Sequence, residues 1–207
     1  MSNNSLMGKK VAVLVESEFV PSEIRAYQDR FAALEMRVDL ISRLWGNPKL
    51  TFVSDVEKAG ETPQTLDVTI DIDSVRPEDY AVVIMAANYT SVRLRWMPPP
   101  ADRPMSPAMV RSAPAVRFFA RAMDNPDIIK GAPCHGLWIL TGTPEHLAGR
   151  RVTCNPVMLA DVANTGAIYV PPVPGSPWEK QIVVDGDLVT SASASASTEF
   201  VNAIAET

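Results

Sequence analysis

Short apolar runs alternate along the chain with stretches whose apolar residues recur at helical spacing. The runs KVAVLVE (10–16) and AVVIMAA (81–87) are almost continuous, which is typical of strands covered on both faces. A further strand is predicted over residues 37–44. After the first strand, apolar residues recur every three or four positions, which indicates a helix with one buried face. The residues of that face are Ile24, Tyr27, Phe31 and Leu34. This order predicts a parallel sheet with crossover helices.

The second half of the chain continues the alternation. A helix is predicted from Pro114, because proline is favoured in a first helical turn, and a strand over IIKGA (128–132). IVVDGDLVTS (182–191) has the Asp-Gly pair of a tight hairpin turn, and a last helix is expected near 198–206. The pattern therefore predicts an α/β fold: a doubly wound, mostly parallel sheet sandwiched by helices, in a single domain over residues 1–207.

Four segments fall outside this pattern. Residues 1–8 are expected to form a flexible N-terminal tail, and residues 50–73 a small hairpin or edge excursion. Residues 97–107 hold five of the 18 prolines and predict a long irregular loop of the kind that often forms a lid. The repeat SASASAS (191–197) has the composition of a linker, but it lies between a strand and a helix, so an ordered loop at the sheet edge is favoured.

Composition and charge exclude several classes of protein. Hydrophobic residues make up 46% of the chain and charged residues 21%, as in folded globular domains. The net charge of -5 argues against a nucleic-acid partner. The apolar runs are far shorter than the roughly 20 residues of a membrane span, and the N-terminus does not resemble a signal peptide. We therefore expect a cytoplasmic protein without membrane contact. Metal-ligand spacings and a glycine-rich phosphate loop are both missing, so no metal and no cofactor are expected.

The motif Ala132-Pro133-Cys134-His135-Gly136 lies between a predicted strand and a helix-like LWILTG segment. This is the strand-turn-helix context of a nucleophile elbow, where small residues on both sides of the nucleophile avoid collisions in a tight turn. A cysteine at a helix N-terminus is stabilised as the thiolate, so Cys134 is predicted to be a nucleophile at neutral pH. Cys154 ends a strand-like VTC segment and is predicted to be a buried structural thiol.

The motif APCHGLWIL, together with the segments from KKVAVLVESEFVPSEI to DGDLVTS, resembles the ThiJ/PfpI superfamily, and in particular its intracellular protease-like branch. The resemblance implies a flavodoxin-like, class I glutamine amidotransferase-like fold. It also implies that Cys134 is the nucleophile, that His135 is the base and that Glu23 lies beside the sulfur. A carboxylate close to a thiolate would be repelled by it, so Glu23 is expected to be protonated and to donate a hydrogen bond to the sulfur.

The resemblance also selects weaker candidates. Ala86 and Ala87 stand where relatives carry a Gly-Gly pair whose backbone N–H groups form an oxyanion hole. Gly136 belongs to the same pocket. Asn88, Tyr89 and Trp96 are candidates for substrate contacts. Protease-like members complete a triad with a glutamate from a neighbouring subunit, but this chain has no acidic residue from position 81 to 101.

These residues favour a cysteine-dependent hydrolase or lyase that acts on a small carbonyl or amide compound. Glyoxalase III-like, deglycase, amidase and weak peptidase activities all remain open, because the fold does not choose among them. The alternative is a redox-stress sensor or chaperone-like protein in which the same cysteine is oxidised. A vestigial site is a third possibility. We also expect a homodimer or other small homo-oligomer, with residues 88–107 lying over or beside the Cys134 crevice.

Overall fold

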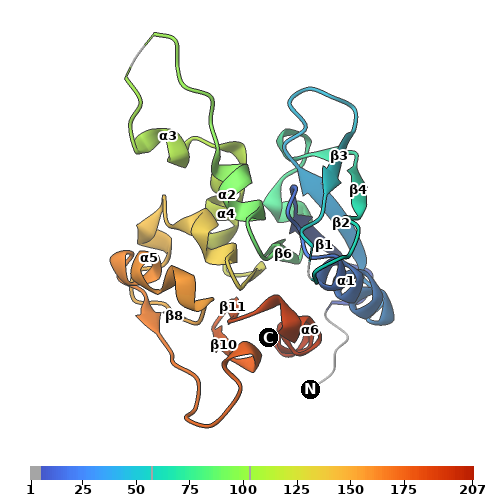
Figure 1. Cartoon of the computed structure of the whole chain (residues 1–207), viewed down its shortest axis with the longest axis vertical. Helices are drawn as coiled ribbons and strands as arrows, with labels where there is room; N and C mark the ends of the chain where they lie inside the picture. Colours follow the sequence, from blue (N-terminus) through green and yellow to red (C-terminus); the bar gives the residue numbers. More distant parts are fainter. Residues whose placement is uncertain (1–5, 57, 103) are drawn as a thin grey trace.

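The computed structural model describes residues 6–56, 58–102 and 104–207, and its centre is a seven-stranded sheet (Figure 1). The strand order is β10-β11-β7-β6-β1-β2-β5, and all neighbours are parallel except β10 and β11. The strands are β1 (Lys10–Leu14), β2 (Arg37–Ser42), β5 (Ile70–Asp71), β6 (Val82–Met85), β7 (Ile129–Pro133), β10 (Ile182–Asp185) and β11 (Leu188–Ser191). The predicted doubly wound α/β fold is confirmed.

Helices cover both faces of the sheet. One face carries α1 (Pro21–Ala33) and α6 (Ser197–Glu206), whose apolar residues share a cluster with Val11 and Ile84 of the sheet. The other face carries α2 (Thr90–Arg95), α4 (Pro114–Met123) and α5 (Leu159–Asn164), together with the elbow segment. The helices predicted from Pro114 and near the C-terminus are both present.

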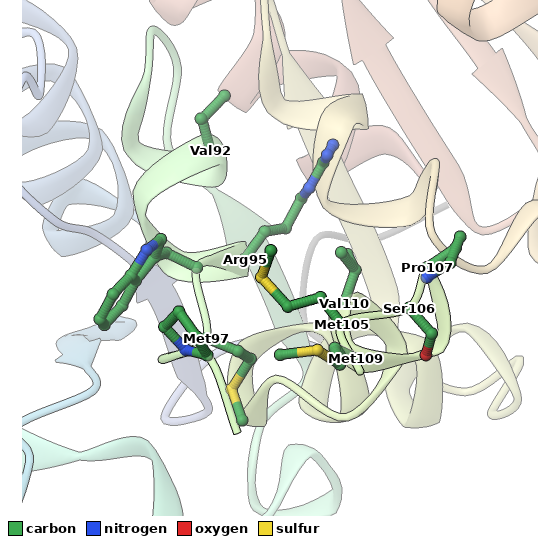
Figure 2. A pocket seen from close by; sticks show the side chains of 10 residues that line it. Val92, Arg95, Met97, Met105, Ser106, Pro107, Met109 and Val110 are labelled. Atoms are coloured by element: carbon green, nitrogen blue, oxygen red, sulfur yellow. The ribbon is translucent and has the colours of Figure 1, made fainter. Parts of the chain in front are cut away.

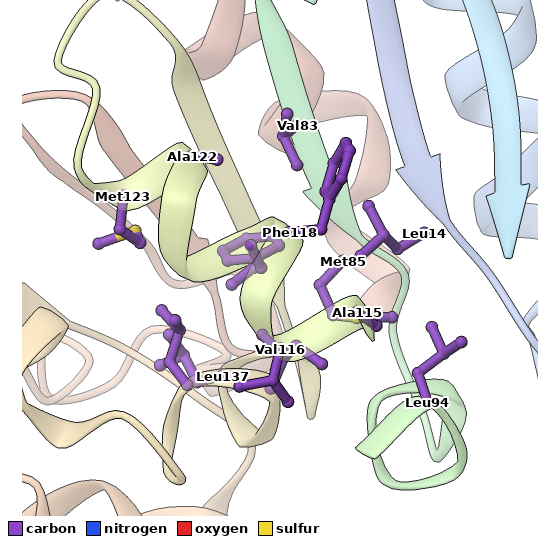
Figure 3. Close-up of a cluster of buried hydrophobic side chains, with 14 of the residues drawn as sticks. Leu14, Val83, Met85, Leu94, Ala115, Val116, Phe118, Ala122, Met123 and Leu137 are labelled. Atoms are coloured by element: carbon purple, nitrogen blue, oxygen red, sulfur yellow. The ribbon is translucent and has the colours of Figure 1, made fainter. Parts of the chain in front are cut away.

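The core on the α4 face explains why the apolar runs are continuous (Figure 3). Val83 and Met85 of β6 meet Val116 and Phe118 of α4 there, and Leu137 of the elbow segment closes the cluster. Residues of β6 that point to the opposite face are buried as well, so all four of its residues are buried. A strand with no solvent-facing side has no polar positions, which is the pattern expected of a central parallel strand.

Two small strand pairs lie outside the main sheet. The hairpin of β3 (Leu50–Val53) and β4 (Thr65–Val68) confirms the predicted excursion between residues 50 and 73. β8 (Arg151–Val152) pairs in parallel with β9 (Ile168–Tyr169). An isolated bridge between Phe19, in the loop between β1 and α1, and Ser54 connects the hairpin to the rest of the domain.

The described residues of the proline-rich segment 97–107 form no regular element, and the segment projects from the domain together with the short helix α3 (Ala108–Arg111) (Figure 1). Residues 1–5 of the expected N-terminal tail lie outside the described residues. Residues 6–8 form a turn in which the Gly8 N–H donates to the Glu35 carbonyl at 2.9 Å. Within the described part of the chain, no helix is long and apolar enough to cross a bilayer.

Candidate active site

Cys134 lies at the turn that follows β7, at the carboxyl edge of the sheet. Its φ angle of 54° is in the left-handed region, which costs a residue with a Cβ roughly 1–2 kcal/mol. Two backbone hydrogen bonds hold this conformation: the Cys134 N–H donates to the Ser191 carbonyl at 2.7 Å, and the Cys134 carbonyl accepts from the Asn155 N–H at 3.2 Å. A strained backbone conformation that is held by hydrogen bonds of both its N–H and its carbonyl group is a feature of nucleophile elbows.

The segment after the cysteine differs from the prediction. Residues Gly136–Leu140 form a 3₁₀ helix rather than the α-helix that LWILTG indicated. A single short turn of this type has a much smaller dipole than a long α-helix, so the argument for a stabilised thiolate loses its basis. The structure explains why position 136 requires a small residue. A Cβ at Gly136 would lie 3.1 Å from the Met85 carbonyl oxygen, which is closer than an ordinary contact.

The Cys134 sulfur is enclosed, with only 8% of the residue exposed. Burial raises the pKa of the Cys134 thiol, and the charge of Glu23 acts in the same direction. Backbone N–H groups of Asn88 and Ala194 lower that pKa, as does the side chain of Asn155, whose Nδ2 lies 3.7 Å from the sulfur. The burial effect is larger, so the predicted low pKa is wrong and Cys134 is a neutral thiol at pH 7.

His135 is in position to exchange a proton with this thiol. Its Nδ1 lies 3.1 Å from the Cys134 sulfur. Burial lowers the pKa of the His135 imidazole, which keeps it neutral and able to accept a proton at pH 7. Among the described residues, no carboxylate hydrogen-bonds to His135. Within one subunit, the described part of the chain therefore has a Cys-His pair without the acid of a triad.

Glu23 is fully buried in the first turn of α1. Its Oε1 accepts a hydrogen bond from the Tyr27 hydroxyl at 2.6 Å, and the Ala87 N–H lies 2.9 and 3.1 Å from its two carboxyl oxygens. Burial and the Glu23 charge raise the pKa of Tyr27 well above its ordinary value, so the hydroxyl stays protonated and donates. Glu23 influences the Cys134 thiol electrostatically, but the hydrogen bond expected from Glu23 to the sulfur stays a prediction.

The oxyanion role predicted for Ala86 and Ala87 does not fit their hydrogen bonds. The Ala86 N–H donates to the Leu14 carbonyl at 3.0 Å within the sheet, and the Ala87 N–H is bound to Glu23. The next amide, that of Asn88, acts on the sulfur instead. Asn88 has a φ angle of 63°, a conformation that Asn tolerates better than most residues.

Tyr89 and Trp96 lie in different places. Tyr89 stacks on His135 beside the sulfur, whereas Trp96 faces an open groove of about 490 Å³ that Cys134 does not line (Figure 2). Figure 2 shows Met97, Met105 and Met109 around the same groove. Asn88, Tyr89 and Ser91 lie beside the Cys134–His135 pair, whereas the chain from Val92 borders a separate groove. The predicted placement of residues 88–107 over or beside the Cys134 crevice therefore holds only for the beginning of that segment.

Sequence reasoning missed three groups that surround the cysteine. Tyr27 had a signal, because it lies four residues after Glu23 and so on the same face of one helix. Asn155 and Ala194 had none, since only the folded sheet brings them to Cys134 from 21 and 60 residues further along the chain.

Comparisons with known proteins identify the family that this chain resembles. The DJ-1/PfpI family model matches residues 105–207, which include Cys134 and His135. Protein/nucleic acid deglycase 2 of Escherichia coli (strain K12) is 27% identical over 186 residues, covering 89% of each chain. An uncharacterised protein of Staphylococcus aureus (strain Mu50) is 26% identical over 187 residues, covering 89% of this chain and 90% of the relative.

Solved structures show the same fold. Drosophila melanogaster DJ-1beta superimposes with a TM-score of 0.68 at 18% identity, covering 97% of this chain and 90% of that one. A two-domain protein from Anabaena variabilis with DJ-1/ThiJ/PfpI-like and ferritin-like domains gives a TM-score of 0.71 at 20% identity; the match covers 96% of this chain but only 47% of that protein. The sequence-based assignment to the ThiJ/PfpI superfamily is thereby confirmed.

Proposed function

We propose that this protein is a cysteine-dependent enzyme that acts on small carbonyl compounds, as a glyoxalase III-like hydratase or a deglycase. The observation that carries the proposal is the distance of 3.1 Å between the Cys134 sulfur and the His135 Nδ1, in surroundings whose burial raises the pKa of the thiol and lowers that of the imidazole. This pair is suited to adding S–H across a reactive C=O bond, a step that needs one proton moved rather than a preformed thiolate. The name of the Escherichia coli relative, a deglycase, supports the same class of substrate.

The chemistry balances without an oxidant or reductant. The sulfur forms a bond to the aldehyde carbon of a 2-oxoaldehyde such as methylglyoxal, the C=O π electrons move to oxygen, and His135 carries the thiol proton to that oxygen. His135 then moves the C1 proton to C2, and the proton of the C1 hydroxyl passes to the C2 oxygen, which converts the hemithioacetal to a thioester with a 2-hydroxyl group. Water hydrolyses the thioester to the 2-hydroxy acid and restores the thiol. The backbone N–H groups of Asn88 and Ala194, which hydrogen-bond the sulfur, are candidate donors for a developing oxyanion.

Efficient peptide cleavage is disfavoured by the same geometry. Amide hydrolysis requires a stronger nucleophile and a protonated leaving group, and burial raises the pKa of Cys134 while no carboxylate of the described residues supports His135. We therefore place small carbonyl compounds ahead of amides and peptides as substrates.

A redox role is the second candidate. The three donors around the sulfur, from Asn88, Ala194 and Asn155, would also hydrogen-bond the oxygens of a sulfinic acid formed by peroxide. Because peroxide attacks thiolate, the raised pKa of Cys134 makes this oxidation slow at pH 7. Intact-mass analysis after mild peroxide treatment tests it: two added oxygens on Cys134 within minutes would favour the sensor.

We also propose that the protein forms a small homo-oligomer and acts in the cytoplasm. The exposed apolar side chains around the groove of Figure 2 support assembly, because Trp96 is 55% and Met105 is 71% exposed. Light scattering coupled to size exclusion should give a dimer or larger, and Trp96→Glu should shift it to the monomer. A wild-type monomer at micromolar concentration would contradict this part of the proposal.

Turnover of methylglyoxal tests the proposed activity. Wild-type protein should produce lactate, Cys134→Ser should produce none above background, and Cys154→Ala should serve as the matched control because that buried thiol lies outside the donor set. Lactate formation that survives in Cys134→Ser, or wild-type protein inactive toward both methylglyoxal and glycated amines, would refute the proposal.

A further inference from the structure

Three aromatic rings gather at the Cys-His pair. The His135 imidazole lies 5.3 Å from the Tyr89 ring at an interplanar angle of 21°, and 5.0 Å from the Trp138 ring at 31°. The Tyr89 and Trp138 rings are themselves 5.9 Å apart at 31°. The three centroids therefore form a nearly equilateral triangle, in which the His135 and Tyr89 rings are stacked and the Trp138 ring is tilted against both. We call Tyr89, His135 and Trp138 the aromatic triad.

The aromatic triad is anchored by three polar contacts from two helices, α2 and α5. The Trp138 indole Nε1 donates to Asp161 Oδ2 of α5 at 2.8 Å, which fixes the plane of the indole. Arg95 of α2 donates to the Trp138 carbonyl at 2.7 Å. Ser91 of the same helix donates to the His135 carbonyl at 3.0 Å. Both the backbone and the rings next to Cys134 are thus held in one arrangement.

A catalytic histidine needs a second support besides its nucleophile. In Ser-His-Asp and related triads a carboxylate orients the imidazole and stabilises the imidazolium that forms during reaction. Here no carboxylate of the described residues hydrogen-bonds to His135, yet its Nδ1 is directed at the sulfur. Aromatic faces supply both functions by other means: stacking restricts rotation of the imidazole, and the ring quadrupole stabilises a cation at short range.

We propose that Tyr89 and Trp138 are positioning residues that replace the triad acid, and that Asp161 acts through Trp138. The inference rests on the proposed function for its kinetic consequence, but the placement of His135 can be tested without it. Tyr89 has a role other than the substrate contact expected from the sequence. During thiol addition, His135 takes up the Cys134 proton while stacked on Tyr89 and packed against the tilted Trp138 ring, so the developing positive charge lies close to both rings.

A matched pair of variants at Tyr89 separates ring stacking from other effects. Tyr89 is 45% exposed, so Tyr89→Leu is compatible with the fold and removes only the stacking ring. In methylglyoxal turnover, Tyr89→Leu should lower kcat about tenfold at unchanged KM, because the stacked ring that stabilises the imidazolium is lost. Tyr89→Phe keeps the ring and should stay within about twofold of wild type. Trp138→Phe and Asp161→Ala should fall between these two.

Nuclear magnetic resonance of ¹⁵N-labelled histidine gives a readout that does not depend on turnover. The wild-type His135 should show one fixed neutral tautomer at pH 7.5, and Tyr89→Leu should show averaging between tautomers, with rescue in Tyr89→Phe. Absence of turnover in the wild type, with this pattern intact, would sink the proposed activity and leave the positioning role supported. A Tyr89→Leu protein with wild-type kcat and wild-type His135 shifts would overturn the positioning role.

Discussion

The pH dependence of Cys134 reactivity follows directly from the burial of its sulfur. Burial raises the pKa of the Cys134 thiol above its ordinary value of 9.0, so the thiol form predominates at pH 7. A thiol with a pKa of about 6 would be about 90% ionised, but its thiolate would also be a weaker nucleophile by about an order of magnitude. The absolute rate at pH 7 therefore distinguishes poorly between a raised and a lowered pKa of Cys134. The shape of the pH profile distinguishes well between them.

Alkylation by iodoacetamide in a Cys154→Ala background measures that shape on a single thiol. We expect the second-order rate constant to rise about tenfold per pH unit from pH 6 to pH 9, because only thiolate reacts. Replacing Cys154 should change the measured alkylation rate little. Burial and the Cys134 charge raise the pKa of the Cys154 thiol to about 12. A plateau between pH 6 and pH 8 would refute the reasoning, because it would require a thiolate-imidazolium pair already present at neutral pH.

Two substitutions test the surroundings of the site. Tyr27→Phe removes a buried hydrogen bond to a carboxyl group, which should cost about 2 kcal/mol and lower Tm by about 4–8 °C; an unchanged melting curve would mean that Tyr27 does not support Glu23. Asn155→Asp keeps an acceptor for the Val157 N–H but replaces the Nδ2 donor 3.7 Å from the sulfur with a carboxylate oxygen. That negative charge should raise the pKa of Cys134 and slow its alkylation at pH 8 about tenfold, while the isosteric control Asn155→Leu should slow it less; equal rates in all three proteins would contradict the assigned donor.

The fold could be predicted because burial on both faces leaves a local signature. β1 and β6 are continuous apolar runs because neither face of these strands contacts solvent. Pro114 is favoured in the first turn of α4 because the backbone N–H that proline lacks would have no partner within the helix at that position. The segment after Cys134 was predicted incorrectly as an α-helix. Its apolar residues are dictated by core contacts of a 3₁₀ turn, and a five-residue segment has too few positions to separate the two periods.

The site could be predicted only in its local part. The elbow motif identified Cys134 and His135 from adjacent residues, and their contact at 3.1 Å agrees with that prediction. The pKa of the thiol could not be predicted, because it depends on how deeply the fold buries the sulfur. The donors from Asn155 and Ala194 reach the pair through tertiary packing, and nothing in the local sequence marks them. The ring of Trp138 is different, because Trp138 lies three residues after His135 in the same 3₁₀ segment.

The covalent intermediate is the most direct test of the central claim, that Cys134 with His135 adds to small carbonyl compounds. Wild-type protein mixed with methylglyoxal at pH 7.5, quenched in acid within seconds and analysed by peptide mass spectrometry, should carry one substrate-derived acyl group on Cys134. The adduct should be absent from Cys134→Ser and should decay as lactate appears. Lactate production without a modified Cys134 at any quench time, or an adduct only on lysine and arginine side chains, would contradict the account.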